Sequence, residues 1–174
     1  MPEVAFRLSA PEGGGIAGAA ILVAYPNGTH RTGETDSRGN WSIDLYRDDL
    51  EMMVLAAATG HLPLCESVLP DKEVIDLVME PSTDGRSAVL FAKSTGYIPG
   101  VEGRLNPIND GRTYLYADNI AINGRVANPL VFEVGESLQL TDVYGVETEI
   151  RFVAVTGQFS LIEFTDPRPF SAQP

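Results

Sequence analysis

The chain has 174 residues, a formal net charge of −12 and a single cysteine, Cys65. Nucleic acids and anionic membrane surfaces attract positive protein surfaces, so this acidic balance argues against both as partners. One cysteine excludes an intramolecular disulfide and a metal site built from several thiolates. Apolar residues make up 44% of the chain, which is enough for a sizeable core. The start, Met-Pro-Glu, is not a basic-then-apolar leader, and this favours the cytoplasm.

Short apolar or alternating segments separated by turn residues fill the first 80 positions. Ala19–Tyr25 is a continuous apolar run too short for a typical helix, which favours a buried strand. Asn27-Gly28 predicts a hairpin turn, because this dipeptide tolerates positive φ. In Asp36–Asn40 the Asp36 carboxylate is expected to cap backbone amides, and Gly39 to adopt a left-handed conformation. The other expected strands are Val4–Leu8, Thr29–Thr35, Trp41–Leu45, Met53–Ala58, Leu62–Leu69 and Val74–Met79.

A polar run with Pro and Gly, residues 81–86, breaks this pattern and predicts a linker between a domain at 1–80 and another at 87–174. Gly96–Gly111 reads as irregular, and the last four expected strands read as a meander. The absence of long amphipathic segments, with turns every 8–12 residues, predicts an all-β fold of sandwiches or barrels. The strands expected after the linker are Ser87–Ala92, Thr113–Ala117, Ile120–Ile122, Leu130–Val134, Ser137–Thr141, Glu147–Val155 and Phe159–Phe164.

Three motifs in the first half carry a family resemblance: Gly18-Ala19, the turn Thr35–Trp41, and Ala58–His61. Together they resemble the transthyretin-like sandwich family, which includes carboxypeptidase regulatory-like domains and collagen-adhesin B-type repeats. The resemblance covers roughly residues 4–80 and implies an N-terminal transthyretin-like β-sandwich, followed by a second small β-sandwich or β-barrel domain of no recognised family. Adhesin-type members form an internal Lys–Asn crosslink. Arg7 stands in the expected lysine strand, so no crosslink is expected.

Few residues indicate chemistry. Four acids near one loop, Asp44, Asp48, Asp49 and Glu51, are weak candidates for a hard cation, with a solvated acidic loop as the favoured interpretation. His30, His61 and Cys65 lack a metal-ligand spacing, and Cys65 is expected in a strand as a small buried hydrophobe. Trp41 alternates with Ile43 and Leu45, which places it in the core rather than on a sugar-binding surface. We expect no catalytic residue, no cofactor and no bound metal.

Tyrosines are the candidate binding surface of the second domain. Tyr114 and Tyr116 share one face of a strand, where they would either line a binding surface or pack. The full set is Tyr97, Tyr114, Tyr116 and Tyr144.

Three functions fit these observations. The favoured one is a non-enzymatic protein–protein interaction or structural module of a larger assembly, whose partner is another protein, possibly basic, or a second copy. The alternative is a carboxylate-dependent hydrolase or its glycan-binding accessory domain, with a cleft near Gly96–Gly111 and an acid whose pKa is raised by burial. The third is an acidic inhibitor that mimics DNA.

Overall fold

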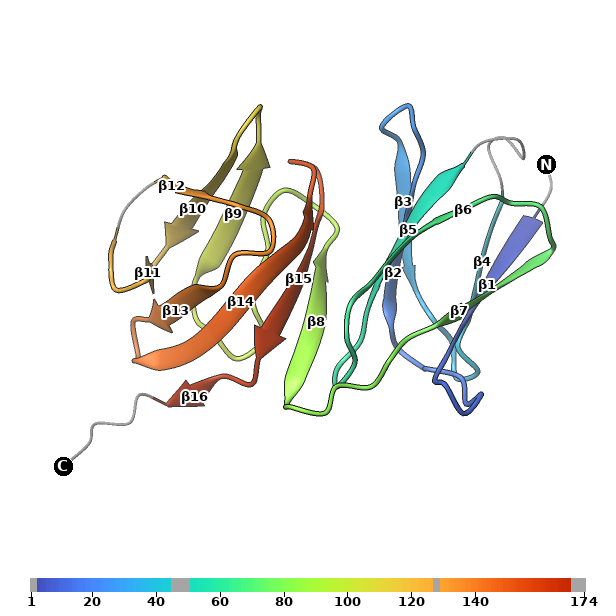
Figure 1. Cartoon of the computed structure of the whole chain (residues 1–174), viewed down its shortest axis with the longest axis horizontal. Helices are drawn as coiled ribbons and strands as arrows, with labels where there is room; N and C mark the ends of the chain where they lie inside the picture. The colour runs from blue at the N-terminus through green and yellow to red at the C-terminus, as the bar shows by residue number, and fades with distance from the viewer. Residues whose placement is uncertain (1–2, 45–50, 127–128, 170–174) are drawn as a thin grey trace.

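The computed structural model describes residues 3–44, 51–126 and 129–169. Regular structure within these ranges is entirely β, with sixteen strands in four sheets. Figure 1 shows two halves side by side, one holding β1 to β7 and the other β8 to β16. The predicted all-β class is therefore confirmed. The described strands form open sheets and do not close into a barrel. None of the described residues belongs to a helix that is long and apolar enough to cross a membrane.

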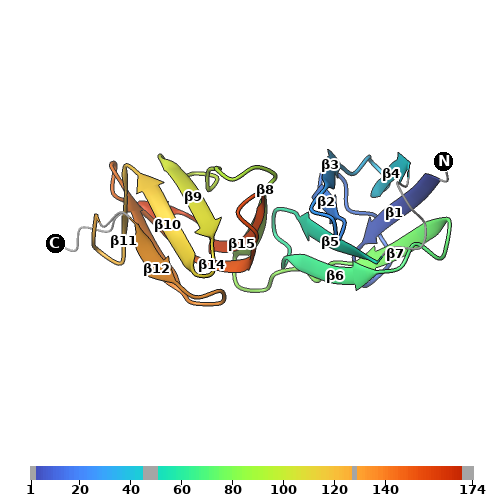
Figure 2. The same cartoon turned by 90° about the horizontal axis from the view of Figure 1, so that it is seen from above.

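The first half contains two facing sheets, visible edge-on in Figure 2. One has the strand order β4-β1-β7, with β1 antiparallel to β4 and parallel to β7. The other is antiparallel with the order β3-β2-β5-β6. The strands are β1 (Glu3–Ser9), β2 (Ala20–Ala24), β3 (His30–Glu34), β4 (Asn40–Asp44), β5 (Met52–Ala57), β6 (Leu64–Val68) and β7 (Val74–Val78).

A single buried cluster fills the space between these two sheets. Strand β1 alternates, so Phe6 and Leu8 point inward and are fully buried, while Arg7 is exposed. Trp41 lies half-buried against this core, with its ring 5.9 Å from that of Phe6. Trp41 therefore packs against the core as predicted, but it stays partly exposed. Its neighbour on the expected face, Leu45, lies outside the described residues.

The predicted turns of the first half are present. The Asp36 carboxylate accepts hydrogen bonds from the backbone nitrogens of Arg38 at 2.8 Å and Asn40 at 3.0 Å. Gly39 has a φ of +83°, and a β-carbon there would collide with the Leu8 carbonyl oxygen. Gly39 is therefore required both for its backbone conformation and for the close approach of strand β1.

The second half also has two sheets. One has the order β12-β10-β9, and the other β11-β13-β14-β15-β8, with β16 paired to β14. Their facing side chains form a second core, in which the Phe132 and Phe152 rings are 4.7 Å apart. The strands are β8 (Arg86–Phe91), β9 (Arg104–Asn109), β10 (Thr113–Asp118), β11 (Ile120–Ile122), β12 (Leu130–Phe132), β13 (Leu138–Asp142), β14 (Val146–Val155), β15 (Ser160–Thr165) and β16 (Arg168–Pro169).

Two expectations for this half are wrong. The segment Gly96–Gly111 is not irregular throughout, because it contains β9, where Pro107 is tolerated on an edge strand of the sheet. The meander includes β13, β14 and β15, whereas Leu130–Phe132 forms β12 in the other sheet. Asn123-Gly124 forms a tight turn, with φ angles of 52° and 77°.

A third buried cluster joins the two halves. Leu22 of β2 and Leu55 of β5 are buried on the outer face of the first half, against Leu161 of β15. Strands β2 and β5 are thus covered on both faces. This is why their sequences are continuous apolar runs instead of alternating ones.

Candidate functional site

A groove of about 540 Å³ lies where the two halves meet. The second half covers the outer face of strands β2 and β5 at Leu22 and Leu55. The groove lies beyond this contact, at Ala24 and Met53. In the sheet register, Met53 of β5 lies opposite Ala24 of β2 and Ser67 of β6, so these three side chains share one face. The groove is lined by Ala24, Tyr25, Pro26, Gly28, Glu51, Met52, Met53, Leu55, Cys65, Ser67, Ala154, Thr156, Gln158 and Phe159.

The lining of this groove is largely apolar and includes sulfur and aromatic groups. The Cys65 sulfur lies 3.6 Å from the Met53 sulfur. Phe159 is buried, and its ring lies 5.2 Å from the His30 ring, centroid to centroid, at an interplanar angle of 60°. Such soft, polarisable walls suit a flat, uncharged ring.

Cys65 does lie in a strand, but it is exposed and not buried as expected. Desolvation by its neighbours, and next the Glu66 carboxylate, raise the pKa of the Cys65 thiol. Neutral pH therefore keeps this thiol protonated, which disfavours a role as a nucleophile.

The second candidate binding surface is the outer face of β10, called here the tyrosine face. The structure brings Tyr114 and Tyr116 onto the outer face of β10, alternating with buried Leu115. Tyr97, 63% exposed, lies close enough to Arg104 to interact with its charge, at the end of the same sheet. Tyr144 is not part of this face, since it lies in the turn between β13 and β14.

Polar groups beside the tyrosine face are largely committed to one another. Arg104 donates to the Asp118 carboxylate, and both side chains are more than half exposed. The Asn106 side-chain oxygen is buried without a hydrogen-bond partner. It lies in a small hollow shared with Tyr116 and Thr95.

The candidate cation site is not assembled by the described residues. Asp44 ends β4 and is exposed, and Glu51 is exposed at the groove. Asp48 and Asp49 lie outside the described residues. Among residues 3–44, 51–126 and 129–169, no three His, Cys, Asp or Glu side chains gather as metal ligands.

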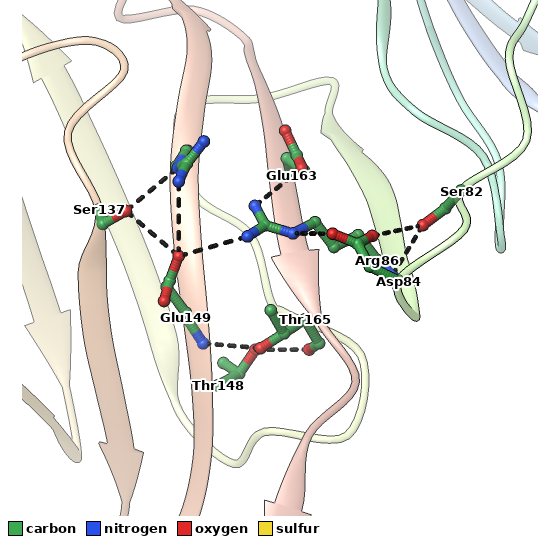
Figure 3. Close-up of polar contacts among 9 residues, drawn as sticks. Ser82, Asp84, Arg86, Ser137, Thr148, Glu149, Glu163 and Thr165 are labelled. Atoms are coloured by element: carbon green, nitrogen blue, oxygen red, sulfur yellow. Dashed lines mark hydrogen bonds and ion pairs between the residues drawn. The ribbon is translucent and has the colours of Figure 1, made fainter.

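A charged cluster crosses the outer face of β8, β15 and β14 (Figure 3). Arg86 lies at its centre, with nitrogens 3.0 Å from Glu163, 3.0 Å from Asp84 and 3.7 Å from Glu149. The pKa of the Arg86 guanidinium is raised, mainly because it donates a hydrogen bond to Glu163. Because Arg86 is shared among three carboxylates, this cluster stabilises the sheet and leaves no free cation for a ligand.

Asp142 is a buried carboxylate that sequence reasoning missed. Its oxygens accept hydrogen bonds from the backbone nitrogens of Glu102, Tyr144 and Val146, each at 2.9 Å. Burial alone would raise the pKa of Asp142, but these backbone donors together outweigh it, so the pKa is lowered. A general acid needs the opposite shift. The only sequence signal is its position just before Gly145, a residue type that is common in turns.

Comparison with models of known protein families finds no match. The chain is 30% identical over 148 residues to a 3′ cyclic ADP-D-ribose synthase, AaTIR, of Aquimarina amphilecti. The match covers 84% of this chain and 44% of that protein, so the chain spans less than half the length of this relative.

This relative is an enzyme, and the expectation of a non-enzymatic module is therefore wrong. The two other expected functions, a carboxylate-dependent hydrolase with its glycan-binding domain and a DNA mimic, fit the relative no better. The sequence did not indicate an enzyme because it has no short catalytic motif. The similarity to this relative is instead spread over most of the chain.

Proposed function

We propose that this chain functions within an enzyme that forms a cyclic ADP-ribose. The observation that carries the proposal is the extent of the similarity to AaTIR, 84% of this chain. Strands β1 to β7 end at Val78 and strands β8 to β16 begin at Arg86, so a match of 148 residues must include parts of both halves. The two halves therefore enter the proposal as one unit.

The described residues support a binding contribution to this activity. Ring formation in an ADP-ribosyl compound requires that the adenine nucleotide be held in a fixed, folded position. The groove between the halves is an apolar concavity at a junction of sheets, where small-molecule sites commonly occur.

The finer description of the fold belongs to the same proposal. We propose that residues 1–80 are a transthyretin-like sandwich, that 81–86 link it to a second domain at 87–174, and that this domain is also a sandwich. Two facing sheets around one buried cluster support the first assignment, and an equivalent pair of sheets supports the last. The hydrogen bonds of the Asp36 carboxylate in the turn at Asp36–Asn40 also support the first assignment.

Binding of this chain to another protein, or to a second copy of itself, stays a prediction. Multi-angle light scattering of the native protein tests it directly. We expect a mass above that of one chain, at least at high protein concentration. A strictly monomeric mass, with no protein co-purifying, contradicts the prediction.

The enzyme proposal is tested on the native protein at its full natural length. NAD is the simplest ADP-ribosyl donor to use as the probe. Its conversion to cyclic ADP-ribose releases nicotinamide and a proton, and mass spectrometry distinguishes the cyclic product from linear ADP-ribose by the mass of one water.

A further inference from the structure

We propose that the groove between the two halves binds the adenine ring of an ADP-ribosyl nucleotide, with the phosphates outside it in solvent. This inference rests on the proposed function, since the product of the relative is an adenine nucleotide.

The construction of the groove supports a small flat ligand. Met53 and Cys65 lie on the same outer face of the first half, which the second half covers farther along at Leu55. Phe159 and the neighbouring β14–β15 turn form the opposite wall. The lining is largely apolar and includes the Met53 and Cys65 sulfurs and the Phe159 ring. Its volume of about 540 Å³ falls within the range of about 300–1,000 Å³ typical of small-molecule sites.

Polar groups at the rim suit the edge of a base. Thr156 accepts hydrogen bonds from the Phe159 nitrogen at 3.1 Å and the Gln158 nitrogen at 3.3 Å, which fixes the turn carrying Gln158. No hydrogen bond of the Gln158 side-chain amide is found within the described part of the chain. This amide and the Ser67 hydroxyl are the donors and acceptors that can meet the ring nitrogens and amino group of adenine.

Charge determines which part of the nucleotide enters. Among the described residues that line the groove, Glu51 alone carries a charge, and that charge is negative. The chain as a whole has a net charge of −12. Phosphates are therefore repelled from the groove, and the uncharged base is favoured. It follows that adenosine binds this chain at least as tightly as ADP-ribose does, with little dependence on salt.

The single cysteine provides a direct readout, because Cys65 lines the groove and no other thiol competes. The rate of Cys65 alkylation by iodoacetamide is measured by intact-protein mass spectrometry at mildly alkaline pH, where enough thiolate is present despite the raised pKa of Cys65. Adenosine at ten times its dissociation constant is expected to slow alkylation about tenfold, by mass action. An unchanged rate at saturating adenosine overturns the inference.

Paired variants locate the effect. Met53→Glu places a carboxylate on the groove wall and is expected to abolish protection by adenosine. Val78→Glu introduces the same charge at an exposed position of β7, which does not line the groove, and is expected to leave protection intact. Equal loss of protection in both variants overturns the inference. Loss of protection in Tyr116→Ala, on the tyrosine face, also overturns it.

Two further outcomes are informative. Protection of Cys65 that rises with protein concentration, without adenosine, shows that a second copy covers the groove, and this overturns the inference. The alkylation assay requires no turnover, so it separates the two proposals. Protection without any cyclic product from the native protein contradicts the proposed function alone, and product without protection contradicts the groove alone.

Discussion

At the residue scale, Asp142 shows how one side chain fixes a segment distant in sequence. Its carboxylate holds the backbone of its own turn and that of Glu102, which is 40 positions away. The local part of this arrangement resembles the Asp36 turn, which was predicted because Asp, Gly and a spacing of a few residues are visible in sequence. The long-range bond was not predictable, because nothing in the sequence near Asp142 specifies Glu102 as its partner.

Replacement of Asp142 by Asn tests this role. The amide offers one acceptor oxygen where the carboxylate offers two, so at least one backbone donor turns toward an NH₂ group. We expect a loss of about 1–3 kcal/mol in the free energy of unfolding at pH 7. Urea denaturation measures this loss.

The pH dependence gives the same test a second readout. The folded-state pKa of Asp142 is lowered, so its contribution is complete above the unfolded value of about 3.9 and is lost as pH falls through the lower folded value. Asp142→Asn should therefore lose less stability than the wild type when the pH is lowered through this range. Identical acid dependence of the two proteins contradicts the role assigned to Asp142.

At the element scale, most strands were predictable, but their distribution among the sheets was not. Runs such as Ala20–Ala24 are readable because burial on two faces leaves a continuous apolar sequence. Strand β9 was missed because Pro107 and several glycines imitate a loop. The assignment of β12 to a different sheet from β13 depends on side chains that meet across the core, and turn spacing does not report them.

The charged cluster of β8, β14 and β15 is expected to stabilise its sheet. The Arg86 side chain is 22% exposed, and its partner Glu163 is 17% exposed. Arg86→Ala leaves the Glu163 carboxylate mostly buried without its counter-charge, and we expect a loss of about 1–3 kcal/mol in unfolding free energy. Arg104→Ala is the matched control, because the Arg104–Asp118 pair is largely exposed and its loss should be close to undetectable. Equal effects in the two variants contradict the distinction.

At the scale of the whole molecule, the two halves pack against each other through a buried apolar cluster. The cluster that joins them buries Leu22 and Leu161, and its open end is the groove. The sequence predicts two separate domains, with the candidate binding surface in the second one. Neither the contact nor the groove was predictable, because each requires the relative placement of β2, β5 and β15.

The account depends most directly on whether the native protein makes a cyclic nucleotide. Purified native protein is incubated with NAD, and the products are separated and compared by mass and retention with authentic 3′ cyclic ADP-D-ribose. A heat-denatured sample controls for spontaneous decay of NAD. We predict time-dependent formation of a cyclic ADP-ribose with stoichiometric release of nicotinamide. NAD left unchanged, or converted to linear ADP-ribose alone, contradicts the account.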